Sequence, residues 1–295
     1  MKKISALLAA GALLGATSVN ADPKVWGSVE QVIQHVDNGS STYWDMYETG
    51  SNYIGFKADE DLGNGMTAFY LMYFRLGSET NTITQWDNYL GLKGNFGKIR
   101  FGRMNSLTKQ LGEDFSNQFQ IGNTLLDSEN WQRNNNAVQW VSPTFNGFNI
   151  GYEVAFDGST GESGADQTEY MVGYKNGPVE LRAAYRDDTA GEDTGIAYGA
   201  KVNMTEDLAV KAAWNNAKEN GVDNKGWAVM ADYKVGNNNY RIGQQNSISA
   251  RDLTTAEVEH FFSKTTSIFL THQISSPESG AADTKTTGLG MRMKF

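Results

Sequence analysis

Segments in which apolar and polar residues alternate recur along almost the whole of this chain. In 148–156 every second residue is apolar, and the segments 179–186 and 227–235 repeat the pattern. Successive side chains of a strand point to opposite faces, so each such segment is a strand with one apolar face. The predicted strands, about sixteen of roughly ten residues each, are 24–36, 52–60, 65–76, 86–94, 97–104, 134–142, 147–156, 167–175, 178–187, 194–203, 207–216, 225–235, 238–246, 254–262, 266–275 and 286–295.

The connections between these strands alternate between short and long. The short ones are 60–65, 94–97, 142–147, 176–177, 205–207, 236–237 and 263–266. The long ones are 37–51, 77–85, 105–133, 157–166, 188–193, 217–224, 247–253 and 276–285. Outer-membrane barrels have short turns on the periplasmic side and long loops outside. An even strand number lets the first and last strands pair, and a bilayer requires that closure. The sequence therefore predicts an all-β fold, a 16-stranded antiparallel transmembrane β-barrel.

Charged residues indicate which face of each strand points inward. An arginine on the lipid face at mid-bilayer would cost about 2–4 kcal/mol. Several charged side chains lie opposite the apolar set of their strand, namely Lys57, Arg75, Arg100, Glu153, Arg182, Arg186, Lys211 and Asp232. The interior is therefore polar, and a barrel of this size is wide enough for an aqueous channel. Phe69 and Leu71 are exceptions, because they fall on the inward phase and the sequence offers no reason for it.

The first residues of the chain have the pattern of a secretory signal peptide. Lys2 and Lys3 precede an apolar run, and Ala21 ends a stretch of small residues. We expect cleavage after Ala21, which leaves 22–295 as one barrel domain exported through the periplasm to an outer membrane. Loss of the two lysines changes the formal charge from −9 to −11. That charge argues against nucleic acid as a partner, and the chain has no cysteine to form disulfides.

The segment 105–133 differs from its surroundings. No run in it alternates for long, and no apolar stripe with helical spacing is evident. Unstructured connections of this length are uncommon in compact domains and are usually functional. We therefore expect this connection to have a role of its own.

Six segments, together spanning nearly all of the mature chain, resemble a known family. They read VWGSVEQ (25–31), NYIGFKADEDLGNGMTAFY (52–70), YLGLKGNFGKIRFGRM (89–104), NNNAVQWVSPTFNGFNIGYEV (134–154), FFSKTTSIF (261–269) and GLGMRMKF (288–295). The chain resembles the general trimeric porins of Gram-negative outer membranes. The resemblance implies a homotrimer and a third outside loop folded into the pore, at 105–133. It also implies that the strand ending in Phe295 is the signal read by the barrel-assembly machinery. LGEDF (111–115) stands where the family often has a compact proline-glycine acidic motif.

Charged residues are candidates for the two sides of a pore constriction. Glu113 and Asp114 would form the acidic side, with Asp127 and Glu129 as further candidates on the same loop. The basic side would be the inward residues Lys57, Arg75, Arg100 and Arg133. Opposed charges across a narrow gap set the ion preference of a channel. The alternative interpretation is an exposed acidic pair on a solvated loop with scattered lumen charges.

Passive diffusion of small hydrophilic solutes and ions is the predicted function. The alternative is a substrate-specific channel for sugars or organic acids, with Phe69, Tyr73 and Tyr89 as inward aromatic candidates. A third possibility is a structural or adhesive barrel with a plugged lumen.

No enzyme activity, cofactor or metal is expected, because His35, His260 and His272 sit in no nucleophile motif. Membrane lipid and lipopolysaccharide are the expected surroundings of the barrel. The net charge predicts a modest preference for cations.

Overall fold

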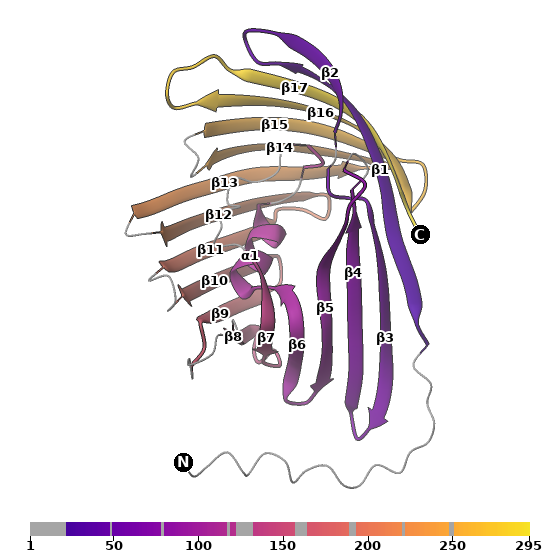
Figure 1. Cartoon of the computed structure of the whole chain (residues 1–295), viewed down its shortest axis with the longest axis vertical. Coiled ribbons are helices and arrows are strands. Elements are labelled where there is room, and N and C mark those ends of the chain that lie inside the picture. Colours follow the sequence, from indigo (N-terminus) through magenta and orange to yellow (C-terminus); the bar gives the residue numbers. More distant parts are fainter. Residues whose placement is uncertain are drawn as a thin grey trace.

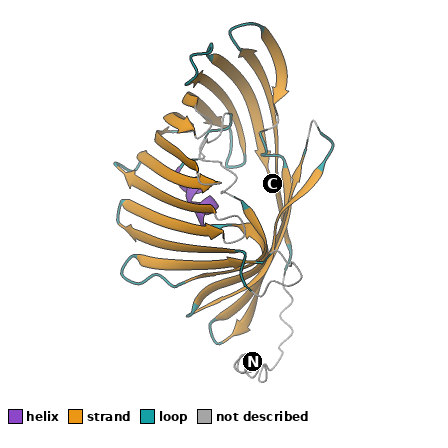
Figure 2. Ribbon diagram, turned by 60° about the vertical axis from the view of Figure 1, so that its left-hand side comes forward, coloured by secondary structure: helices purple, strands orange, loops and turns teal. Residues whose placement is uncertain are grey.

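The strands form a single sheet that closes on itself. A computed structural model describes residues 22–47, 49–77, 80–116, 119–121, 132–156, 164–188, 193–219, 222–247 and 251–295. Every paired strand is antiparallel to its neighbour along the chain, and Figures 1 and 2 show the wall that they form. β1 (Lys24–Asp37) pairs with β17 (Thr284–Lys294), from Ser28 opposite Lys294 to Asp37 opposite Lys285. The barrel therefore has no free edge, as a bilayer requires.

Sixteen strand positions make up this wall. β2 (Thr42–Tyr47) pairs with the later half of β1, and β3 (Tyr53–Gly63) pairs with its beginning, so β2 and β3 share one position. The remaining strands are β4 (Met66–Leu76), β5 (Ile83–Gly94), β6 (Gly97–Asn105), β7 (Arg133–Val141), β8 (Phe148–Ala155), β9 (Gln167–Asn176), β10 (Val179–Asp188), β11 (Asp193–Asn203), β12 (Leu208–Glu219), β13 (Val222–Val235), β14 (Asn238–Ser247), β15 (Arg251–Phe261) and β16 (Thr266–Pro277). The predicted 16-stranded antiparallel barrel is confirmed.

The two faces of the wall differ as the alternation predicts. Large apolar side chains such as Val29, Leu181 and Tyr198 are exposed on the outside. Their neighbours along each strand point inward, and many of these are buried polar groups, among them Glu153 and Glu169. An apolar outside and a polar inside suit a barrel set in lipid. In the described ranges, no helix is long and apolar enough to cross a membrane.

The structure corrects several predicted boundaries. The predicted connection 37–51 contains the strand β2, which extends the β1 hairpin. β5 begins at Ile83 and β12 ends at Glu219, so strands reach further into the predicted long connections 77–85 and 217–224. The segment 105–133 contains a helix, α1 (Leu107–Phe115), where no helical spacing was recognised.

Tight turns join the strands at the end of the barrel opposite the long connections. Between β3 and β4, Gly63, Asn64 and Gly65 all have positive φ, which glycine adopts freely and asparagine tolerates. Gly97 has a φ of +97°, and a Cβ there would lie 2.2 Å from the carbonyl oxygen of Val141. The backbone thus requires glycine at this turn.

Candidate functional site

α1 carries an apolar stripe of three residues on the inside of the barrel. Ser106 caps its N-terminus, where the serine Oγ accepts a hydrogen bond of 3.1 Å from the amide of Lys109. Leu107, Leu111 and Phe115 follow at intervals of four, lie on one face and are fully buried. A helix this short is marginal alone. Its stability therefore depends on what that face contacts.

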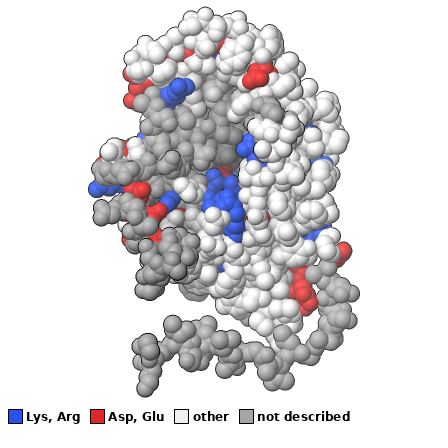
Figure 3. All heavy atoms as spheres, viewed as in Figure 1, with Lys and Arg blue, Asp and Glu red and all other residues white. Residues whose placement is uncertain are grey.

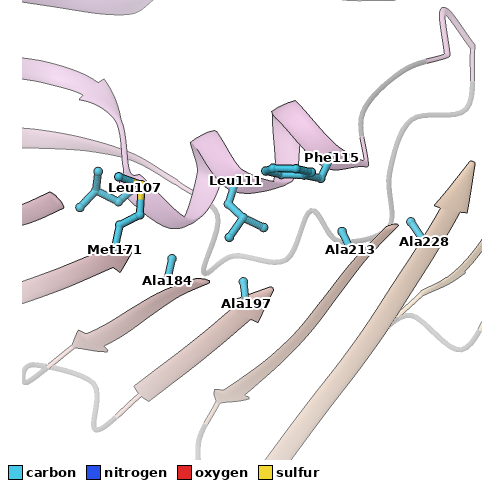
Figure 4. Close-up of a cluster of buried hydrophobic side chains, with 8 residues drawn as sticks. All are labelled: Leu107, Leu111, Phe115, Met171, Ala184, Ala197, Ala213 and Ala228. Carbon is cyan, nitrogen blue, oxygen red and sulfur yellow. The ribbon is translucent and has the colours of Figure 1, made fainter. Parts of the chain in front are cut away.

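Small residues on the inner wall receive the stripe. Figure 4 shows Leu107, Leu111 and Phe115 directed at the wall, with the buried residues Met171, Ala184, Ala197, Ala213 and Ala228 of β9–β13 below them. The Phe115 ring lies against Gly199, where a Cβ would come within 2.4 Å of the ring. Larger inward side chains at these positions would hold the helix off the wall.

A buried carboxylate fixes the beginning of α1. Oε2 of Glu169, a fully buried residue of β9, accepts hydrogen bonds from the amide (2.8 Å) and hydroxyl (3.0 Å) of Thr108. Negative charge at a helix N-terminus is favourable, because the first amides have no partner within the helix. The wall therefore sets both the position and the direction of α1.

Residues after α1 continue along the same inner face. Phe119 packs over Gly243 of β14, and Ile121 contacts Gly288 of β17 and Val32 of β1. The amide of Gln120 donates to Oε2 of Glu257 (2.8 Å), and its side-chain oxygen accepts from Arg292 (2.8 Å). The described part of the segment 105–133 therefore runs across the lumen side from β9 to β17.

The two predicted acidic residues of α1 point to different walls. Glu113 accepts a 2.6 Å hydrogen bond from Asn105 and lies 3.8 Å from Lys109 Nζ and 3.9 Å from Arg133 Nη2. Asp114 instead accepts a 2.6 Å bond from Arg182 of β10. Burial raises the pKa of Glu113, although the nearby cations Lys109 and Arg133 act against that rise. Asp127 and Glu129 lie outside the described residues.

The four predicted basic residues lie on the inner face, and each is placed over an aromatic ring. Lys57 lies 5.5 Å from the ring centroid of Trp26, and Arg100 lies 5.1 Å from that of Tyr89. The distances to Trp86 are 5.8 Å for Arg75 and 4.3 Å for Arg133. Figure 3 shows Lys and Arg side chains gathered where α1 meets the ends of β5 and β6.

Two of these four bases also contact α1 or its neighbourhood directly. Arg133 forms a 2.8 Å ion pair with Asp87 besides its contact with Glu113. Arg100 is buried and donates to Gln110 of α1 (3.5 Å) and to Gln139 of β7. Glu113 and Arg133 are thus the predicted residues of opposite charge that the structure brings together.

Residues that the sequence analysis did not assign to the site also hold α1. The strand phases predicted that Arg182 and Lys211 point inward, yet nothing linked them to Asp114. Lys211 donates to the main-chain oxygen of Asp114 (3.2 Å), beside the ion pair of Arg182. Lys109 was likewise missed, although its spacing of four residues from Glu113 on a helix would have indicated the contact.

Carboxylates neutralise the arginines on the wall formed by β13–β17. Arg241 of β14 pairs with Glu257 and Glu259 of β15, with 2.9 Å separating Arg241 from Glu259. Arg292 of β17 also pairs with Glu259. The arginines of this wall are therefore paired with carboxylates. On the wall formed by β3–β7 the bases lie over aromatic rings, and Arg133 is also paired with Asp87.

The C-terminal residue lies at the seam of the barrel. Phe295 and Gly27 exchange two main-chain hydrogen bonds of 3.0 and 3.1 Å. The phenyl ring covers Gly27 on the outside, where a Cβ would come within 2.4 Å of it.

Comparison with known proteins decides the family. A family model described as Gram-negative porin matches residues 5–276. The chain belongs to the Gram-negative porin family. Major outer membrane protein P.IB of Neisseria meningitidis serogroup A is 28% identical to this porin over 279 residues, 82% of each chain.

Solved structures share the barrel of this porin. An anion-selective porin from Comamonas acidovorans is 20% identical, with a TM-score of 0.79 over 94% of this chain and 100% of that one. OmpT of Vibrio cholerae, solved in a trimer form, is 16% identical, with a TM-score of 0.69 over 93% and 99% of the chains. These likenesses show the fold.

Family and fold together make this porin an integral channel of the Gram-negative outer membrane for passive diffusion. Members of the family are channels rather than enzymes.

Proposed function

We propose that the segment 105–133 narrows the lumen of this porin, and that charges at the narrowing bias the passage of small hydrophilic solutes and ions. The supporting observation is that α1 and residues 119–121 pack on the lumen side of the wall. Glu113 forms the acidic side of the narrowing, and Arg133 with Arg75 and Arg100 forms the basic side. Asp114, paired with Arg182, contributes less.

The lumen charges favour anions, the opposite sign from the one that the net charge predicts. Asp87, Asp114, Glu257 and Glu259 are all held in ion pairs. In the described part of the chain, no ion pair joins Lys57, Lys98 or Arg100 to a carboxylate. Charges inside a narrow pore are weakly screened, since the Debye length is about 8 Å at physiological salt. Positive charge therefore dominates the field that a passing ion meets.

Planar bilayers in a salt gradient test this proposal. We expect open-channel conductance and a reversal potential whose sign indicates that anions pass more easily than cations. Its size should be below the roughly 59 mV of a perfectly selective pore in a tenfold gradient. The bias should weaken near 1 M salt, where the Debye length is about 3 Å. A reversal potential of the opposite sign, which indicates preference for cations, would refute the anion preference. Absence of conductance would favour a plugged barrel.

Acidification should increase the preference for anions. Glu113 carries a negative charge above its pKa and none below it, and burial raises that pKa. As pH falls through this raised value, the acidic side of the narrowing loses its charge, so the reversal potential moves further toward anions. We expect Glu113→Gln to show the shifted value already at neutral pH and to lose this pH-dependent step.

Asp114→Asn is the matched control for that change. It removes a charge from the neighbouring residue, which contacts Arg182 on the other wall. We expect it to retain the pH-dependent step. Equal effects of the two substitutions would mean that neither carboxylate has a special position.

A substrate-specific channel is the second candidate. Phe69, Tyr73 and Tyr89 all lie on the inner face, where Tyr73 stacks on Trp26 with ring centroids 5.1 Å apart. Aromatic rings along a pore wall favour solutes with flat or apolar parts. Competition by sugars or organic acids for single-channel current would separate the two candidates.

Assembly and processing are also part of the proposal. The small outward residues Gly27, Ala58 and Ala68 lie on β1, β3 and β4, which form the contact surface of a homotrimer. Chemical cross-linking in membranes would report it. Lipid and lipopolysaccharide cover the remaining apolar outside, and Phe295 is read by the barrel-assembly machinery. Residues 1–21 are removed on export, which N-terminal sequencing of the mature protein would check.

A further inference from the structure

Two lysines face each other across the strands β5 and β6 near their tight turn. Lys93 and Lys98 are directly paired in register, and both side chains point into the lumen. Like charges in this position destabilise a sheet. Both ammonium groups lie over one aromatic ring, with Nζ of Lys98 5.1 Å and Nζ of Lys93 5.9 Å from the centroid of Phe69.

Glycine fixes the position of that ring. Phe69 of β4 is directly paired with Gly91 of β5, and a Cβ at Gly91 would come within 2.4 Å of the ring. The phenyl group therefore lies flat on the wall, with only 9% of the residue exposed. An aromatic face attracts a cation through its quadrupole but carries no net charge. The ring positions the two lysines and leaves their positive charge in place.

The acidic group at this place compensates only part of the charge. Asp59 of β3 lies 2.9 Å from Nζ of Lys93, and both side chains are about half exposed, at 63% and 48%. An ion pair so exposed is weak and screened by salt. Lys98 has no such partner among the described residues, and Arg100 is the next inward residue of β6. Positive charge therefore remains in excess.

A second pair of inward lysines has different surroundings and serves as a comparison. Lys201 of β11 is directly paired with Lys211 of β12. Glu180 is directly opposite Lys201 on the other side, and Lys211 donates to the carbonyl oxygen of Asp114 (3.2 Å). Among the described residues no aromatic ring lies over this second pair, whereas Lys93 and Lys98 share the ring of Phe69, and Asp59 contacts Lys93 alone.

We propose that Lys93 and Lys98, seated over Phe69, form a binding subsite for a small oxyanion with two negative charges. Two ammonium groups over one ring present several N–H donors to one point, and hydrogen phosphate or a short dicarboxylate offers the matching oxygens. A bound dianion also relieves the repulsion between the lysines. Phe69 is a positioning residue, and this accounts for an apolar side chain on the inward phase.

The subsite lies apart from α1. It is next to the turn Gly94–Gly97, whereas α1 follows the opposite end of β6 at Asn105. The inference rests on the proposed function, because a solute reaches this place only through an open lumen. Its role there is to retain dianions transiently and raise their local concentration in the channel.

Inorganic phosphate is the probe for the first experiment. In planar bilayers with potassium chloride at neutral pH, we expect phosphate to reduce the chloride current of the wild type in a saturable way. Phe69→Leu should weaken this block about tenfold, because the ring that holds the two ammonium groups at one place is lost. Lys98→Gln should abolish it. The block is expressed relative to the chloride conductance of each variant, and succinate in a second series distinguishes dicarboxylates from phosphate.

Lys201→Gln is the matched control, because it removes an inward lysine from the pair that lacks a ring. We expect its phosphate block to equal that of the wild type. Equal block in wild type, Phe69→Leu and Lys98→Gln would overturn the subsite, and so would equal weakening by Lys201→Gln.

Calorimetric titration of phosphate into the folded protein in detergent separates the subsite from the channel. A wild type without conductance would refute the proposed function, while calorimetric binding that Lys98→Gln removes would still support the subsite. If Phe69→Leu does not fold, the comparison of Lys98→Gln with Lys201→Gln decides the matter. Absence of phosphate binding to the folded wild type by both methods would also overturn the proposal.

Discussion

Replacing Leu111 and Phe115 together by alanine should release α1 from the barrel wall, and the channel should then conduct more and with larger fluctuations. Both side chains are fully buried against small residues of β10–β13. Truncations of this kind cost about 2–5 kcal/mol each. A nine-residue helix has little stability of its own to offset such a loss. The measurements are single-channel conductance and protease cleavage within 105–133.

The barrel itself should remain intact in this double variant. The strands are held by their own ladders and by the closure between β1 and β17. We therefore expect unchanged heat-modifiable migration in electrophoresis. Leu181→Ala is the control. Leu181 belongs to β10, one of the strands on which α1 packs, but its side chain points outward. Unchanged conductance in a variant whose α1 is cleaved by protease would mean that the helix does not narrow the path.

The barrel could be predicted from the sequence because its signal is local and repeated. Alternation with period two fixes both the strand and its buried face, and closure follows from the even count. Charged residues such as Arg100 and Glu153 lie on the inner face, as the strand phase predicted, because a charge facing lipid is costly. Strand ends were less predictable: β2 lies inside the predicted connection 37–51, where it pairs with the later half of β1.

The helix α1 was missed because its stability comes from a distant surface. Leu107, Leu111 and Phe115 are only three apolar residues, spaced four apart, among polar ones. What selects the helix is the set of alanines on β10–β13 and Gly199, which follow it by many residues in the chain. No local pattern reports that those small side chains face α1.

The site was predicted in part for a related reason. Residue types and strand phase were enough to find inward bases, and Arg133 does meet Glu113. Adjacent residues of a helix point in different directions, so Glu113 and Asp114 could not both face the same wall once α1 formed. Phe69 remained unexplained because its role depends on Lys93, Lys98 and Gly91 from two neighbouring strands.

Deleting Phe295 should prevent most of this porin from reaching its folded state in the outer membrane. The residue exchanges two main-chain hydrogen bonds with Gly27 and thereby completes the seam between β17 and β1. Its loss leaves backbone groups of Gly27 unpaired, at several kcal/mol for each group that lipid surrounds. It also removes the end of the apolar face formed by Leu289, Met291 and Met293. The measurement is the amount of heat-modifiable protein in outer-membrane fractions.

Phe295→Ala and refolding in detergent separate the two ways in which the deletion could act. The alanine variant keeps the main-chain bonds to Gly27 and loses only the ring, which is 59% exposed and covers one glycine. If the ring is the feature that the assembly machinery reads, this variant refolds in detergent like the wild type but assembles poorly in cells. If the seam matters instead, the alanine variant assembles normally and only the deletion fails, in detergent as well as in cells. Normal outer-membrane levels of the deletion variant would exclude both roles for Phe295.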